Sequence, residues 1–111
     1  MKYIIPQNKI DKMVFEYLDS ILKELQKKNA ANFDGIVFVF PNDKHGILGW
    51  ENNGTLWIYY ELTNIISSNF KLGKSDSDLI ITNWFSNRLE LKVNHTKRFN
   101  LELPNWLKTE D

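Results

Sequence analysis

The sequence predicts an α+β fold: an antiparallel sheet of about five or six strands, with a long N-terminal helix and two short helices packed on it. Three features indicate it: an amphipathic segment near the N-terminus, an unbroken apolar run at Gly35–Phe40, and an Asn-Gly turn between two β-prone segments. A chain of 111 residues has the usual size of one domain, so we expect residues 1–111 to share one core.

The N-terminal part predicts a short β-prone segment, Met1–Ile5, followed by the long helix. Apolar side chains recur every three or four positions, as on one helix face: Ile10, Met13, Val14, Tyr17, Leu18, Ile21, Leu22 and Leu25. Asn8 suits the N-cap, and Lys27 and Lys28 suit the negative end of the helix dipole. We therefore expect the helix to end at Asn29–Asn32.

The next part predicts three strands. Gly35–Phe40 is β-branched and aromatic and is too short for a helix, which indicates a central strand buried on both faces. Ile47–Glu51 and Thr55–Tyr60 flank Asn52-Asn53-Gly54. Asn-Gly supplies the positive φ angles of a tight turn, so these two segments are predicted to form a hairpin.

Two short helices are expected next. Leu62, Ile65, Ile66 and Phe70 mark the first, with Gly73 suited to its exit. Leu79–Phe85 follows a run of capping residues, Ser75–Asp78, which favours a helix. A strand competes there, because Ile-Ile-Thr and Trp-Phe are β-prone.

The C-terminal part predicts a second hairpin. Arg88–Val93 and Arg98–Leu103 both alternate between apolar and charged residues, and Asn94–Lys97 would join them. Charged residues on one face of each strand indicate a sheet with one solvated side.

Composition limits the function classes. Lys plus Arg and Asp plus Glu both number 14, so the net charge is zero and there is no clear nucleic-acid signal. Without cysteine, the chain has no disulfide and no thiolate site. No stretch approaches the roughly 18 apolar residues of a membrane span, and no signal peptide is recognised, so we expect a cytoplasmic protein with no membrane partner. Zero net charge leaves a homodimer open.

Catalytic and metal chemistry have little support. His45 and His95 fall in predicted turns, and only His45 has a carboxylate nearby in sequence, at Asp43. Asp76 and Asp78 lack the glycine and glutamate of a calcium loop and are interpreted as helix-capping groups. The five glycines form no phosphate-binding loop, so no metal and no cofactor are predicted.

Aromatic residues of the first hairpin are the most informative feature. Trp57 and Tyr59 point to one face of their strand, while Leu56 and Ile58 point to the other. If no second layer covers that face, Trp57 and Tyr59, with Trp50 near them, form an aromatic platform of the kind found at interfaces and base-stacking surfaces. The alternative is that they complete a core.

Basic residues gather around the predicted second hairpin loop. Lys92, Lys97 and Arg98 suit a phosphate or an acidic partner, and a solvated charged loop is the alternative interpretation.

Several segments also occur together in one group of proteins: Met1–Ile5, Tyr17–Asp19, Gly54–Leu62, Ile65–Ser68, Asp76-Ser77 ahead of Ile80-Ile81 and Trp84, and Leu91–Asn94. In these segments the chain resembles small uncharacterised proteins of bacteriophages and viral metagenomes. The resemblance implies a viral accessory origin and no activity. The Ile-, Asn- and Lys-rich composition is also similar to that of immunity proteins of bacterial toxin systems.

These observations give three functional hypotheses. The first is a non-enzymatic phage accessory or immunity-type protein that binds a protein partner stoichiometrically and neutralises it, with Trp50, Trp57 and Tyr59 as anchors. The second is a nucleotide-binding or sequestering protein, in which the aromatics stack on a base and Lys92, Lys97 or Arg98 hold phosphate. The third is a small hydrolase that uses His45 or His95 with a carboxylate.

Overall fold

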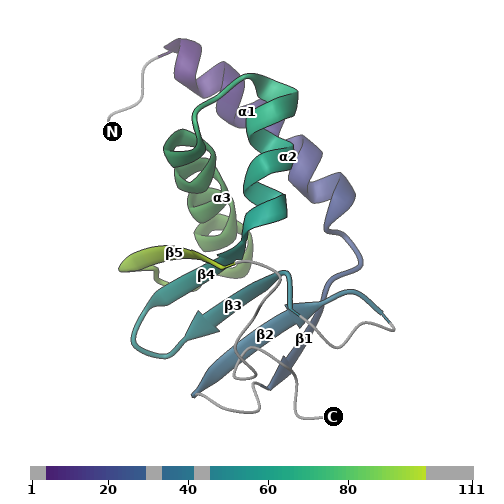
Figure 1. Ribbon diagram of the computed structural model, residues 1–111, viewed down its shortest axis with the longest axis vertical. Coiled ribbons are helices and arrows are strands. Elements are labelled where there is room, and N and C mark those ends of the chain that lie inside the picture. Colours follow the sequence, from purple (N-terminus) through teal and green to yellow (C-terminus); the bar gives the residue numbers. More distant parts are fainter. Residues whose placement is uncertain (1–4, 30–33, 42–45, 100–111) are drawn as a thin grey trace.

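A computed structural model describes residues 5–29, 34–41 and 46–99, with side chains from residue 9 onward. It confirms the α+β fold: helices lie on one side of a mixed sheet (Figure 1). The helices of the described residues are α1 (Ile5–Ile21), α2 (Tyr60–Phe70) and α3 (Lys74–Leu89). The strands are β1 (Gln26–Asn29), β2 (Gly35–Val39), β3 (Leu48–Glu51), β4 (Thr55–Tyr59) and β5 (His95–Phe99).

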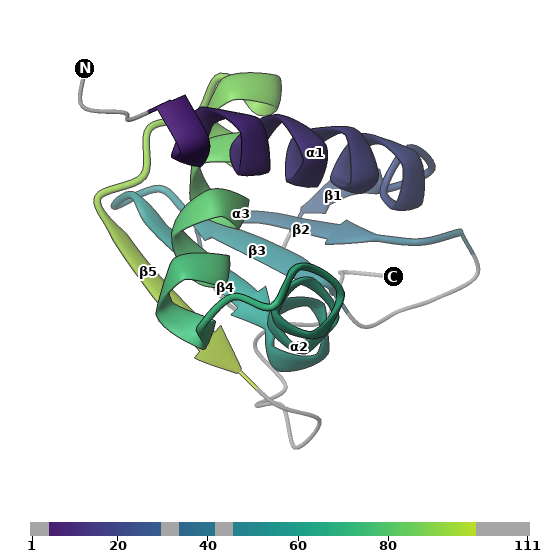
Figure 2. The same ribbon diagram turned by 90° about the horizontal axis from the view of Figure 1, so that it is seen from above.

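The five strands lie in the sheet in chain order, β1 to β5. Neighbours are antiparallel except for β4 and β5, which are parallel. A parallel pair needs a long crossover, and α2 and α3 supply it (Figure 2). The two helices thus return the chain over the sheet face that α1 also covers.

Helix α1 is shifted toward the N-terminus from its predicted place. It begins at Ile5, not after an N-cap at Asn8, and proline is tolerated in its first turn because that N–H has no helical partner. It ends at Ile21, so placing Lys27 and Lys28 in its last turn was wrong: both lie in β1, where pairing with β2 overrides helix propensity. Residues 1–4 of the predicted first strand lie outside the described residues.

The first hairpin is confirmed, with a three-residue connection. Of the three connecting residues only Gly54 has a positive φ, of 96°, and its N–H donates to the Glu51 carbonyl at 2.8 Å. This arrangement, a turn followed by a residue with positive φ, is the usual form of a three-residue hairpin loop.

Both short helices exist, with other boundaries. Helix α2 ends at Phe70, and its C-cap is Lys71, which has a left-handed conformation with a φ of 55°. Gly73 was expected at this helix exit but is the N-cap residue of α3. Leu79–Phe85 is helical, as the capping residues indicated, but they lie inside α3 and provide no side-chain cap.

The predicted second hairpin was wrong. Arg88 and Leu89 lie in the last turn of α3, Glu90 is its C-cap, and β5 runs parallel to β4. The alternation of apolar and charged residues that suggested a strand at Arg88–Val93 is also compatible with the end of a helix. Leu89 packs against the core there, while Arg88 is exposed. Residues 100–103 lie outside the described residues.

The main core lies between the helices and the sheet. Its buried members come from all three helices and from β2, β3 and β4: Val14, Leu18, Leu22, Phe38, Leu48, Leu56, Ile58, Leu62, Ile66, Ile80, Ile81, Trp84 and Phe85. Phe85 is fully buried, and its ring meets Phe38 edge to face at 5.4 Å between centroids. Helix α3 therefore joins the other two helices to the centre of the sheet.

Polar contacts attach β5 to the helices. Asp78 of α3 accepts a hydrogen bond from the buried Thr63 hydroxyl at 2.6 Å and pairs with Arg98 at 2.8 Å. The Thr82 and Thr96 hydroxyls share a hydrogen bond of 2.9 Å. Asp78 is thus a link between α2, α3 and β5, which replaces its predicted capping role. Within the described residues, none of the helices combines the length and the apolar character of a membrane span.

Candidate functional site

The strand register divides the predicted aromatic platform between the two sheet faces. Trp57 and Tyr59 lie on the sheet face away from the helices, since Leu56 and Ile58, which alternate with them along β4, belong to the core. Trp50 pairs with Leu56 and therefore lies on the helix side, where it packs against the core. Sequence alternation placed Trp57 and Tyr59, but Trp50 could be placed only from the register of β3 against β4.

Trp57 is half-buried and held by two charged neighbours. Its indole N–H donates to Glu51 Oε1 at 2.9 Å. Lys97 is the partner of Trp57 on β5, and its Nζ lies 5.5 Å from the indole ring centroid. A cation at this distance from a tryptophan ring is attracted by the ring quadrupole. The two contacts fix the orientation of the ring on the sheet face.

The same face carries a band of apolar side chains beside Trp57. The Tyr59 ring lies 5.5 Å from Phe99, its partner on β5, at 32° between the ring planes. Val37 and Val39 of β2 are 0% and 1% exposed on this side. Val37, Val39 and Phe99 are buried and offer no surface to a partner. The half-buried Trp57 and Tyr59, with Glu51 and the exposed Lys97 beside Trp57, are called here the outer sheet face.

The three predicted basic residues do not converge. Lys97 lies on the outer sheet face, while Arg98 points to the helix side and pairs with Asp78. Lys92 is exposed between α3 and β5, and its carbonyl accepts the Trp50 indole N–H at 3.1 Å. Alternate positions of one strand point to opposite faces, so adjacent Lys97 and Arg98 cannot hold one phosphate together.

The predicted acid–base groups are not assembled into a site among the described residues. His95 is exposed on β5, and Asp76 is exposed in the first turn of α3. Within residues 9–29, 34–41 and 46–99, no three His, Asp or Glu side chains lie close enough to hold a metal ion. His45 lies outside the described residues.

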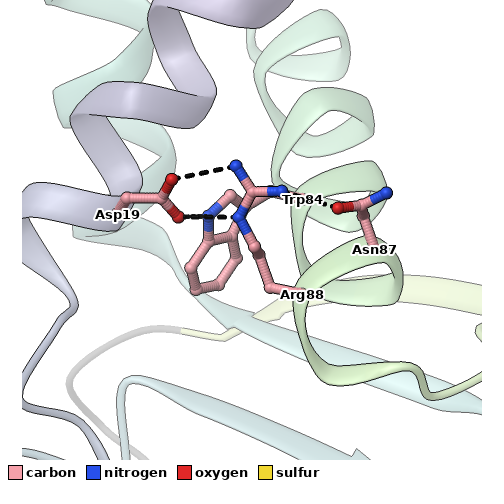
Figure 3. Close-up of polar contacts among 4 residues, drawn as sticks. All are labelled: Asp19, Trp84, Asn87 and Arg88. Carbon is pink, nitrogen blue, oxygen red and sulfur yellow. Dashed lines mark hydrogen bonds and ion pairs between the residues drawn. The ribbon is translucent and has the colours of Figure 1, made fainter.

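A polar cluster that the sequence did not reveal joins α1 to α3 (Figure 3). Asp19 Oδ1 accepts hydrogen bonds from Trp84 Nε1 at 2.8 Å and Arg88 Nε at 2.9 Å, and Oδ2 accepts from an Arg88 terminal nitrogen at 2.9 Å. Another Arg88 nitrogen donates to Asn87 at 2.6 Å. Trp84 and Arg88 are four residues apart and so lie on one helix face, but Asp19 lies 65 and 69 positions before them in the chain. The sequence alone therefore does not show that the three side chains meet.

This cluster shifts two pKa values. The Arg88 guanidinium, and then the Trp84 indole N–H, hold the pKa of Asp19 below its usual value. The hydrogen bond to Asp19 in turn raises the pKa of Arg88. Both side chains are partly exposed, at 43% for Asp19 and 39% for Arg88, so solvent screens the pair.

Replacing Asp19 with asparagine is expected to lower the free energy of unfolding at pH 7 by less than about 1 kcal/mol. The folded-state pKa of Asp19 is depressed, so its ionised form stabilises the fold above the ordinary carboxyl pKa of about 4, and this is lost as the pH falls through the folded value. The difference in the free energy of unfolding between wild type and Asp19→Asn, measured by urea denaturation, should therefore shrink as the pH falls from about 5 to about 2.

The control repeats the same comparison in an Arg88→Gln background. Because Arg88 is the main cause of the shift, the larger part of the pH dependence should disappear there. An unchanged pH dependence in that background would show that Arg88 does not set it.

Two hollows lie beside Arg88. An open groove of about 670 Å³ lies between α1 and α3, and Phe15 and Arg88 are among the residues that line it. The Arg88 guanidinium lies over the Phe15 ring, 5.3 Å from the ring centroid. A smaller pocket of about 260 Å³ lies where the ends of α1 and α3 meet β1 and β2. Asp19, Trp84 and Arg88 of the polar cluster are among the residues that line this pocket.

Comparisons of the chain with family models, curated proteins and solved structures found no significant match. The resemblance to phage proteins and to immunity proteins therefore stays a prediction.

Proposed function

We propose that this chain is a non-enzymatic binding protein that covers a protein partner with its outer sheet face and neutralises it stoichiometrically, as a phage accessory or immunity-type protein does. The observation that carries the proposal is the fixed orientation of Trp57, between the Glu51 carboxylate at 2.9 Å and the Lys97 ammonium at 5.5 Å. Tryptophan is the residue type most enriched among interface hot spots.

The flanking charges favour a protein partner over a nucleotide. Glu51 and Lys97 place an anion and a cation beside Trp57, which suits the mixed polar rim of a protein interface. Of the basic residues that were expected to hold phosphate, Arg98 lies on the helix side with Asp78, and Lys92 lies between α3 and β5. Pre-ordered rings also lose little side-chain entropy on binding, which raises affinity for a given contact area.

The test uses tagged wild type, Trp57→Ala and Leu79→Ala to capture proteins from a lysate of the cells that naturally contain this chain. Leu79 is the matched control, because it is an apolar side chain, 56% exposed, on α3 at the other side of the molecule. The captured protein is then purified and titrated calorimetrically. We expect one partner per chain and a loss of affinity of about 30-fold or more for Trp57→Ala.

Lys97→Glu is a second variant, which keeps the Trp57 side chain but reverses the charge over its ring. Thermal melting of every variant shows whether it is folded. Equal binding by wild type, Trp57→Ala and Lys97→Glu would contradict the outer sheet face as the binding surface. Loss of binding in Leu79→Ala alone would move the surface to the helices.

A further inference from the structure

The pocket of about 260 Å³ lies on the helix side of the sheet, away from the outer sheet face. The end of α1 and the residues that follow it form one wall, and the last turn of α3 forms another. Lys27 of β1 pairs with Phe38 of β2, so both side chains face the helices and enter the lining. The pocket shares no residue with the proposed partner surface.

The inner part of the pocket is apolar. Phe38, Trp84 and Leu22 are 3%, 5% and 6% exposed, so they form its floor, and the half-buried Leu25 and Leu89 complete it. An apolar cavity of about 150 Å³ is enough to bind benzene. The volume here therefore suits an apolar group of about one ring with a short polar extension.

The mouth of the pocket is basic. Lys23, Lys27 and Arg88 line it together with one carboxylate, Asp19, which Arg88 and Trp84 already engage. Within the described part of the chain, no carboxylate pairs with Lys23 or Lys27. Asp19 and Arg88 balance each other, so the two lysines give the pocket a net positive charge beside its apolar floor.

We propose that this pocket binds a small amphiphilic carboxylate, with an apolar body of about one ring on Phe38, Trp84 and Leu89 and its anionic head between Lys23 and Lys27. Each part of the ligand follows from a part of the pocket: the body from the volume and the buried floor, the head from the unpaired ammonium groups. The Asp19–Arg88 pair holds Trp84 by its indole N–H and so keeps the floor in place.

The test is a titration of ¹⁵N-labelled protein with 3-phenylpropionate, followed by amide and indole chemical shifts. We expect shifts at Lys23, Lys27, Leu89 and the Trp84 indole N–H, with a Kd on the order of 1 mM or tighter, as a ligand of this size allows. The neutral 3-phenylpropanamide lacks the anionic head and acetate lacks the body. Both should bind about 10-fold more weakly or worse.

A Lys23→Gln/Lys27→Gln double variant should weaken 3-phenylpropionate binding by about 10-fold or more. The matched control is Lys9→Gln/Lys74→Gln, which removes two exposed lysines from the far ends of α1 and α3 with the same change in net charge. The proposal is overturned if acid and amide bind equally, if no shifts occur at the pocket, or if the control weakens binding as much. The wild-type ligand series decides alone if a double variant does not fold.

Discussion

Replacing Phe85 with alanine is expected to lower the free energy of unfolding by about 3–5 kcal/mol. Phe85 is fully buried in α3 and packs edge to face against Phe38 of β2, an interior strand of the sheet. Truncation removes the transfer free energy of the ring and leaves a cavity where helix and sheet meet. Domains of this size have about 5–15 kcal/mol in total, so urea denaturation should show a large fall in the midpoint.

The matched substitution is Leu79→Ala in the same helix. Leu79 is 56% exposed, and alanine is the better helix former, so its effect should stay within about 0.5 kcal/mol. Similar losses for the two variants would show that Phe85 does not occupy the core position described here.

The second large effect is expected from Gly54→Ala, at about 2–4 kcal/mol. Gly54 has a φ of 96°, which alanine adopts only with strain. A Cβ there would also lie 2.9 Å from Asn94 Cγ, so the Asn94 side chain would have to move. The Gly54 carbonyl accepts the Asn94 N–H at 2.7 Å, so the disturbance reaches the start of β5. Chemical denaturation measures the loss.

Gly73→Ala is the control for this second substitution. Gly73 has an ordinary φ of −68°, and a Cβ at this position meets no atom within 4 Å. Its effect should therefore stay within about 1 kcal/mol in either direction. If the two alanine variants unfold at the same denaturant concentration, the hairpin loop is not strained by a side chain at Gly54.

Local sequence patterns predicted the elements whose structure depends mainly on residues within the element itself. The β3–β4 hairpin depends on Gly54 within its own loop, and the helix expected over Leu79–Phe85 lies within α3. Strand β1 and the parallel placement of β5 depend on partners elsewhere in the chain. A one-dimensional pattern does not contain this pairing, so Lys27 was assigned to a helix and Arg98 to a hairpin.

The candidate sites follow the same division. Alternation along one strand placed Trp57 and Tyr59 together, as the register of β4 shows. The separation of Trp50 from them required the offset between two strands. Asp19 and Arg88 are 69 positions apart, and only the packing of α1 on α3 brings them within 2.9 Å.

The strand order has a consequence for how copies of this chain meet. Among the described strands, β1 and β5 are the sheet edges. Lysines occupy both of them: Lys27 and Lys28 lie on β1, and Lys97 lies on β5, where the adjacent Arg98 is already paired with Asp78. Two sheets that approached edge to edge would bring like charges within a few ångströms, which opposes strand pairing between copies. Although the net charge of the chain is zero, we expect this placement of lysines to disfavour open-ended polymerisation through the sheet edges.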